Sequence, residues 1–156
     1  MAASDVDRVW ELMDKISVCM LTTHEGEKIR SRPMAAFVRH ADDAVYFLTD
    51  AQDHKEEEIR DNPNVGLGFA DGQNFVSVTG HAAISQDRKK IEELWSIGAN
   101  AWWDSPHDPN IRLLTVTPDD AEFWEGPGRI AGTIKLAAAA ATHSRPDYGT
   151  DRKVVM

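Results

Sequence analysis

The strongest constraint on the fold is a series of β-rich segments that are separated by turn residues rather than by regularly interposed helices. These segments run over 18–23, 28–39, 44–49, 65–70, 75–84, 111–117 and 121–125. Strands that alternate with helices favour a parallel sheet, whereas strands joined by turns favour antiparallel pairing. We therefore predict a mainly β (α+β) fold, an antiparallel barrel of about six or seven strands with peripheral helices.

Turn residues predict how the first three of these segments connect. Gly26 follows the first segment, and Asp42 with Asp43 precedes the third. Glycine adopts the left-handed backbone conformations that tight turns need, and adjacent acidic residues are typical of turns. Three consecutive strands joined by short turns predict a meander.

Helical signals flank these strands. The helical segments are 4–16, 55–60, 87–95 and 131–141. Ser4, Asp53 and Asp87 stand where helix N-caps are expected, since a side-chain oxygen there accepts a bond from a free backbone N–H. Pro63 ends the second helix, because proline disfavours the helical conformation in the residue before it.

Length and charge limit the domain count and the partners. At 156 residues the chain can bury a single core. We predict one domain over 1–156, with about 143–156 as a C-terminal tail. The formal net charge of −9 argues against a nucleic-acid partner, because nucleic-acid binding requires a concentration of Lys and Arg.

The sequence predicts neither a membrane span nor a secretory signal. The longest apolar stretches, 16–21 and 136–141, fall far short of the ~20 residues of a membrane helix. The first residues are acidic rather than basic and apolar. The single cysteine, Cys19, cannot form an intrachain disulfide and is expected to be an inert buried thiol. The expected location is the cytoplasm.

The segment Arg30-Ser-Arg-Pro-Met34 carries the most informative chemistry. Residues two apart in a strand point to the same face, so Arg30 and Arg32 can act together. Guanidinium groups bind phosphate through paired hydrogen bonds. The alternative is an edge strand whose charges prevent aggregation, and Pro33 suits an edge or a bulge.

A second group of polar residues follows the strand 44–49. Thr49 ends that strand, and His54 with Lys55 begins the next helix, so a hydroxyl, an ammonium and a helix N-terminus can converge on one anion. The alternative is a surface cap in which Asp50 and Asp53 stabilise the helix start and Lys55 extends into solvent. Spacing alone leaves both readings open.

Several familiar sites are not expected. The six histidines have no partner at the spacing of a metal site, so no metal is predicted. No nucleophile elbow, dinucleotide-binding glycine motif or phosphate-binding P-loop motif occurs in the sequence. Trp124, at a strand end before Gly126-Pro-Gly128, can either cover a flat ring or close the mouth of the barrel.

Taken together, these pieces resemble the pyridoxamine 5′-phosphate oxidase-like flavoproteins, and among them the bacterial general stress protein 26 family. The similarity covers about residues 5 to 150. Its markers are Met20-Leu-Thr-Thr23, Arg30-Ser-Arg-Pro-Met34, Tyr46-Phe-Leu-Thr-Asp50, His54-Lys55, Asn62-Pro63, Val76-Ser-Val-Thr-Gly80, Lys90-Ile-Glu-Glu-Leu-Trp95 and Glu122-Phe-Trp124. Their order and spacing together make the resemblance specific.

The resemblance implies a homodimeric split β-barrel with FMN at the subunit interface. It also assigns the cofactor-binding residues, which are Arg32, Pro33, Met34 and Ala35 along the flavin ring and ribityl chain, Leu48 and Thr49 at the ribityl or phosphate region, His54 and Lys55 at the phosphate, and Trp124 and Trp102 from the partner subunit. It names no catalytic residue for this chain.

One departure from the family pattern narrows the activity. In the oxidase that names the superfamily, an Arg-x-His-x-Arg pattern follows the tryptophan segment. The matching run here keeps Arg129 but has Ala131 and Thr133 in place of the histidine and the second arginine. Synthesis of pyridoxal phosphate is therefore not expected.

Three functions remain open. The first is an FMN-dependent oxidoreductase of unknown substrate, in which a small molecule or a nicotinamide donates electrons to the flavin. The second is a non-catalytic flavin-binding stress protein. The third is a split barrel that uses F420 or haem instead of FMN.

Overall fold

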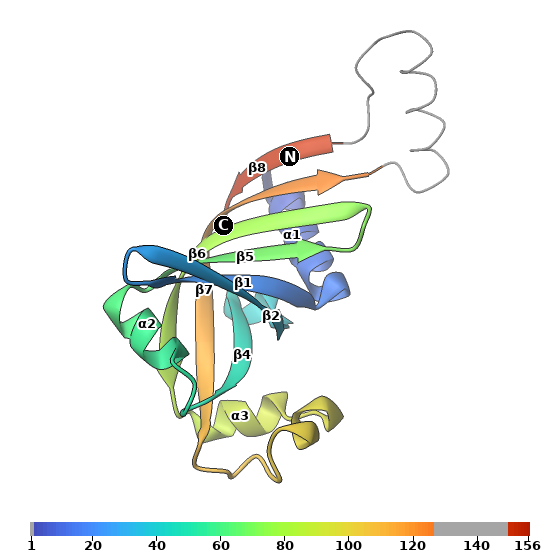
Figure 1. Cartoon of the computed structure of the whole chain (residues 1–156). Coiled ribbons are helices and arrows are strands. Elements are labelled where there is room, and N and C mark those ends of the chain that lie inside the picture. Colours follow the sequence, from blue (N-terminus) through green and yellow to red (C-terminus); the bar gives the residue numbers. More distant parts are fainter. Residues whose placement is uncertain (1, 127–149) are drawn as a thin grey trace, which may run out of the picture.

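The structure, a computed structural model, describes residues 2–126 and 150–156 (Figure 1). The helices are α1 (Ala2–Ile16), α2 (Lys55–Asp61) and α3 (Arg88–Leu94), with two 3-10 turns, η1 (His40–Asp42) and η2 (Ile97–Ala101). The strands are β1 (Val18–Glu25), β2 (Lys28–Ala35), β3 (Phe37–Arg39), β4 (Ala44–Asp50), β5 (Asn64–Ala70), β6 (Asn74–Ser85), β7 (Ile111–Glu125) and β8 (Thr150–Val155). The helix expected over 131–141 and the run from Arg129 to Thr133 lie outside the described residues.

The strands form one eight-stranded antiparallel sheet. Its order is β2-β1-β5-β6-β7-β4-β3, and β8 pairs with β7. The sheet curls into a half-barrel with helices at its periphery, α2 on one side and α3 below the lower strands (Figure 1). The predicted mainly β, α+β split barrel is confirmed.

The expected meander is wrong. The segment 28–39 is two strands, because Ala36 leaves the ladder and its backbone N–H donates to the carbonyl of Ser17 over 2.8 Å. β2 then pairs with β1, whereas β3 pairs with β4. The chain thus crosses from one part of the sheet to the other at Ala36.

The two strands expected over 111–117 and 121–125 are one strand, β7. Pro118 and its acidic neighbours looked like a turn, but they lie opposite a register shift between Thr79 and Gly80 of β6. Such a bulge accommodates an extra residue without ending the strand. Within the expected C-terminal tail, 150–155 form β8, which pairs with the second half of β7.

The helix starts predicted from the sequence are confirmed in part. Asp87 caps α3, since its carboxylate accepts from the Lys90 backbone N–H over 3.1 Å. α1 begins at Ala2 rather than at Ser4, and the residue before α2 is His54 rather than Asp53.

Among residues 2–126, no helix is long and apolar enough to span a membrane.

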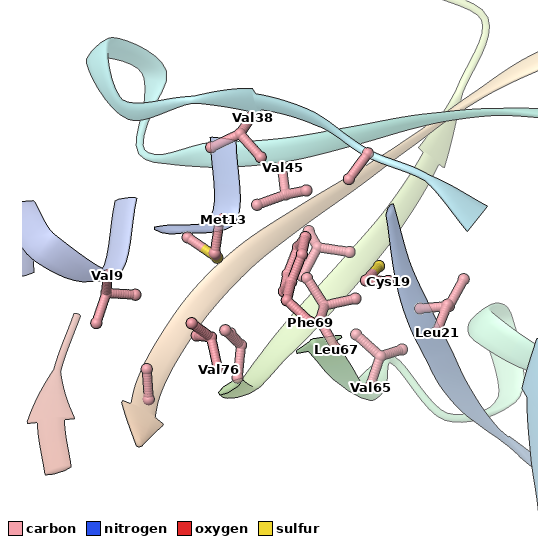
Figure 2. Packing of buried hydrophobic residues seen from close by; sticks show 14 of the residues in the cluster. Val9, Met13, Cys19, Leu21, Val38, Val45, Val65, Leu67, Phe69 and Val76 are labelled. Atoms are coloured by element: carbon pink, nitrogen blue, oxygen red, sulfur yellow. The ribbon is translucent and has the colours of Figure 1, made fainter. Parts of the chain in front are cut away.

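The main core lies between the concave face of the sheet and α1. Figure 2 shows side chains of α1, β1, β5 and β6 meeting around Phe69, among them Met13 and Leu67. Cys19 belongs to this core, and burial raises the pKa of its thiol to about 12. The thiol is therefore protonated at neutral pH and inert, as expected from the sequence.

Gly80 offers a test of the β6–β7 crossing. A Cβ at this residue would lie 2.7 Å from the Thr117 carbonyl oxygen and 3.0 Å from Val116 Cγ1. We expect Gly80→Ala to lower the free energy of unfolding by about 1–3 kcal/mol, because two central strands must separate. Urea unfolding measures the loss. Gly68→Ala is the control, since no neighbour lies within 4 Å of its Cβ, and an equal loss in both variants would contradict this reading.

Candidate functional site

A cleft of about 550 Å³ lies where β2, the end of β4, the start of α2 and the η2 region meet. Its volume falls in the range of small-molecule sites. The lining residues are Arg32, Pro33, Met34, Ala35, Phe37, Leu48, Thr49, Asp50, Asp53, Lys55, Ser96, Ala99, Trp102 and Trp103. The structure thus brings most of the residues predicted from the sequence to one place.

Lys55 is the buried cation of the cleft. Although it begins a surface helix, it is only 7% exposed. Its ammonium donates to the carboxylate of Asp53 and lies 3.4 Å from the hydroxyl of Thr49, which is also buried. The alternative in which Lys55 extends into solvent is wrong, because the end of β4 and the start of α2 enclose it.

Asp53 balances that buried charge. Its Oδ1 accepts from the Lys55 backbone N–H over 3.1 Å, and its Oδ2 accepts from the Lys55 ammonium. Burial acts to raise the pKa of Asp53, but the bonds from the Lys55 side chain and backbone outweigh it and hold the pKa below its usual range. The carboxylate is therefore ionised at neutral pH.

Arg32 is held by a buried network on its inner side. Its guanidinium donates to Thr23 Oγ1 over 2.8 Å and to Glu58 Oε2 over 3.1 Å. The Thr23 hydroxyl donates to the same Glu58 oxygen over 2.7 Å. Packing from β1 and α2 thereby fixes the direction of this arginine toward the cleft.

Arg30 does not share this role. It is exposed and donates to Glu25 over 2.5 Å at the far end of the hairpin. β2 is also the edge strand of the sheet, and Pro33 lies within it. The edge-strand reading of the Arg30–Met34 segment is therefore confirmed, and the two arginines do not act together, since Arg30 lies in solvent whereas Arg32 lines the cleft.

The opposite wall of the cleft is aromatic and apolar. Trp102 is 80% exposed at the rim, and the indole N–H of Trp103 donates to Asp50 Oδ2 over 3.1 Å. Sequence reasoning did not list Trp103, Asp50, Asp53 or Phe37 as site residues. The available signal was proximity in the sequence, since Trp103 and Asp50 directly follow Trp102 and Thr49, while Asp53 and Phe37 lie two residues from Lys55 and Ala35.

Of the predicted residues, His54 is exposed and does not line the cleft. Trp124, which was predicted to reach the flavin of a partner subunit, does not line the cleft of its own chain. Trp102 lines the cleft of its own chain, although it was expected to reach the flavin from a partner subunit. Among the described residues, no cluster of His, Cys, Asp or Glu could hold a metal ion.

The donor set fits a flat ring that carries a phosphate. Lys55, Arg32 and Thr49 offer charged and hydroxyl donors at one part of the cleft. Met34, Leu48 and Trp102 offer apolar and aromatic surface for a ring. This combination of few polar groups with apolar walls is typical of cofactor sites.

A half-barrel with peripheral helices and a cleft of this composition places the chain among the split-barrel proteins. A family model described as pyridoxamine 5′-phosphate oxidase like matches residues 4–147. The chain belongs to this family, and the resemblance seen in the sequence is confirmed.

Individual relatives agree. General stress protein 26 of Bacillus subtilis strain 168 is 33% identical over 136 residues, which cover 83% of this chain and 94% of that protein. A crystal structure from Jannaschia sp. CCS1, assigned to general stress protein 26, is 26% identical with a TM-score of 0.81 and covers 99% of both chains. The general stress FMN/FAD binding protein of Xanthomonas citri is 22% identical with a TM-score of 0.70, over 79% of this chain and 89% of that chain.

Proposed function

We propose that this chain binds FMN in the cleft and serves as an FMN-dependent oxidoreductase. The observation that carries the proposal is the buried Lys55 ammonium, beside the Thr49 hydroxyl and in the same cleft as Arg32. A buried lysine ammonium with a hydroxyl and an arginine in the same cleft can bind a phosphate through charge-assisted hydrogen bonds. The FMN/FAD binding of the Xanthomonas citri relative supports a flavin as the ligand.

In this proposal the protein binds and orients the flavin rather than supplying the redox chemistry. Bound FMN would supply hydride transfer at N5 of its ring. Lys55, Thr49 and Arg32 would hold the phosphate, and Met34, Leu48 and Trp102 would contact the ring or the ribityl chain. His54 is not included, because it does not line the cleft.

The test is a titration of the purified protein with FMN. We expect FMN fluorescence to be quenched and the melting temperature of the protein to rise. Protein that retains the ligand should absorb at roughly 450 nm, near the usual flavin maximum. A colourless protein whose stability FMN leaves unchanged would refute the proposal. Oxidation of reduced nicotinamide by the FMN-loaded protein then separates an oxidoreductase from a non-catalytic flavin-binding protein.

We further propose that two copies of the chain form the working unit. The sheet exposes large apolar side chains at Val18 and Met20 on β1, Phe75 on β6 and Trp124 on β7, and Phe75 pairs directly with Trp124. Pro33 and Ala35, which line the cleft, pair with Met20 and Val18. A second copy on this face would therefore border the cleft, and its Trp124 would be available to the flavin.

The dimer can be tested by light scattering. We expect a dimer for the wild-type chain and a monomer for Phe75→Arg, because a charge at the centre of an apolar interface prevents its burial. Glu57→Arg, at an exposed position of α2 outside this sheet face, is the control. A wild-type monomer at micromolar concentration would contradict the proposal.

A further inference from the structure

The carboxylate of Asp53 occupies one of the bonding positions of the Lys55 ammonium at the cleft. Asp53 lines the cleft with its side chain 40% exposed, while the Lys55 side chain behind it is 9% exposed. Seen from the cleft, the lysine is therefore already paired. The Lys55 ammonium has three N–H donors, and Asp53 and Thr49 take two of them.

A phosphate that bonds to the Lys55 ammonium would lie within a few ångströms of the Asp53 carboxylate. Both groups are anionic at neutral pH, and like charges this close in a partly buried site repel strongly. The remaining carboxylates have other partners. Glu58 accepts from Arg32 and Thr23, and Asp50 accepts from the indole of Trp103.

We propose that Asp53 competes with the ligand phosphate for the Lys55 ammonium and so limits the affinity of the cleft for phosphorylated ligands. This inference rests on the proposed function, since it concerns the same cleft. Without a ligand, Asp53 compensates the buried lysine, which is otherwise costly. With a ligand, the phosphate takes over the compensation and Asp53 turns toward solvent.

The substitution Asp53→Asn separates the charge from the structural role. The amide oxygen of asparagine still accepts from the Lys55 backbone N–H, so the start of α2 keeps its bond. Asp53→Ser is a second variant, because a hydroxyl makes the same local bond in a different shape. Glu57→Gln is the matched control, since it removes one negative charge from α2 at an exposed position that does not line the cleft.

The experiment is a fluorescence titration of wild type and variants with FMN and with riboflavin, which lacks the phosphate. We expect both Asp53 variants to bind FMN roughly tenfold more tightly than wild type, because a repulsive charge is removed. Riboflavin affinity should change less than about twofold, and Glu57→Gln should match wild type for both ligands. Melting temperatures without ligand should fall in the Asp53 variants, because the buried ammonium loses its carboxylate.

The outcomes distinguish this inference from the function on which it rests. If wild type binds FMN but both Asp53 variants bind it equally or more weakly, the competition is refuted and the flavin site stands. If the Asp53 variants bind FMN and riboflavin more tightly by the same factor, the phosphate is not the competing group and the inference is again refuted. If no protein binds either flavin, both the inference and the proposed function fail.

Discussion

Replacing Lys55 with alanine is expected to weaken FMN binding by about 1–3 kcal/mol, or roughly 5- to 150-fold in Kd, as for a charge-assisted hydrogen bond to phosphate. The loss has two sources. The ammonium no longer bonds the phosphate, and the Asp53 carboxylate that it neutralised now faces the ligand. Isothermal titration of both proteins with FMN measures the difference.

Two controls, riboflavin as the ligand and a second lysine variant, show whether the loss of affinity comes from the contact with the phosphate. Riboflavin affinity should change little in Lys55→Ala, because riboflavin carries no phosphate. Lys89→Ala, at an exposed position in α3, should bind FMN as wild type does. Unchanged FMN affinity in Lys55→Ala would show that the phosphate lies elsewhere in the cleft. The double variant Asp53→Asn/Lys55→Ala should recover part of the loss, and the cycle measures the coupling.

Replacing Phe47 with alanine is expected to lower the free energy of unfolding by about 3–5 kcal/mol, which is typical of a large aromatic residue removed from a core. Phe47 is 0% exposed in β4, and its strand partner Leu114 in β7 is also fully buried. The same strand ends in Thr49 and Asp50 at the cleft. Urea unfolding followed by tryptophan fluorescence measures the change.

Two further variants test whether burial is the cause. Phe47→Leu should lower the free energy of unfolding less than Phe47→Ala does, since it leaves a smaller cavity. Ile29→Ala should lose little, because Ile29 is 71% exposed. A loss in Ile29→Ala as large as in Phe47→Ala would contradict the assignment of Phe47 to the core.

Local sequence signals predicted the elements well where the local interactions decide them. The β-rich segment 75–84, preceded by turn residues, predicted β6, and Asp87 marked the start of α3 correctly. They failed at Ala36, where a bond to Ser17 divides one predicted strand, and at Pro118, where a bulge keeps two predicted strands continuous. Both failures depend on partners distant in the sequence, which local patterns cannot indicate.

The sequence by itself determined the class of fold and the residues of the cleft wall in β2 and β4. Local features of the sequence carried the resemblance to the family: the β-rich segments, the turn residues between them, and the segments around Arg32 and Lys55. Only the tertiary structure decided which charges face the cleft. Arg30 and Arg32 are equivalent in the sequence, but Glu58 on α2 holds one toward the cleft while Glu25 holds the other in solvent. The tertiary structure likewise buried Lys55 between Asp53 and Thr49 at the end of β4. An ion pair becomes costly to separate only when the fold removes water from it.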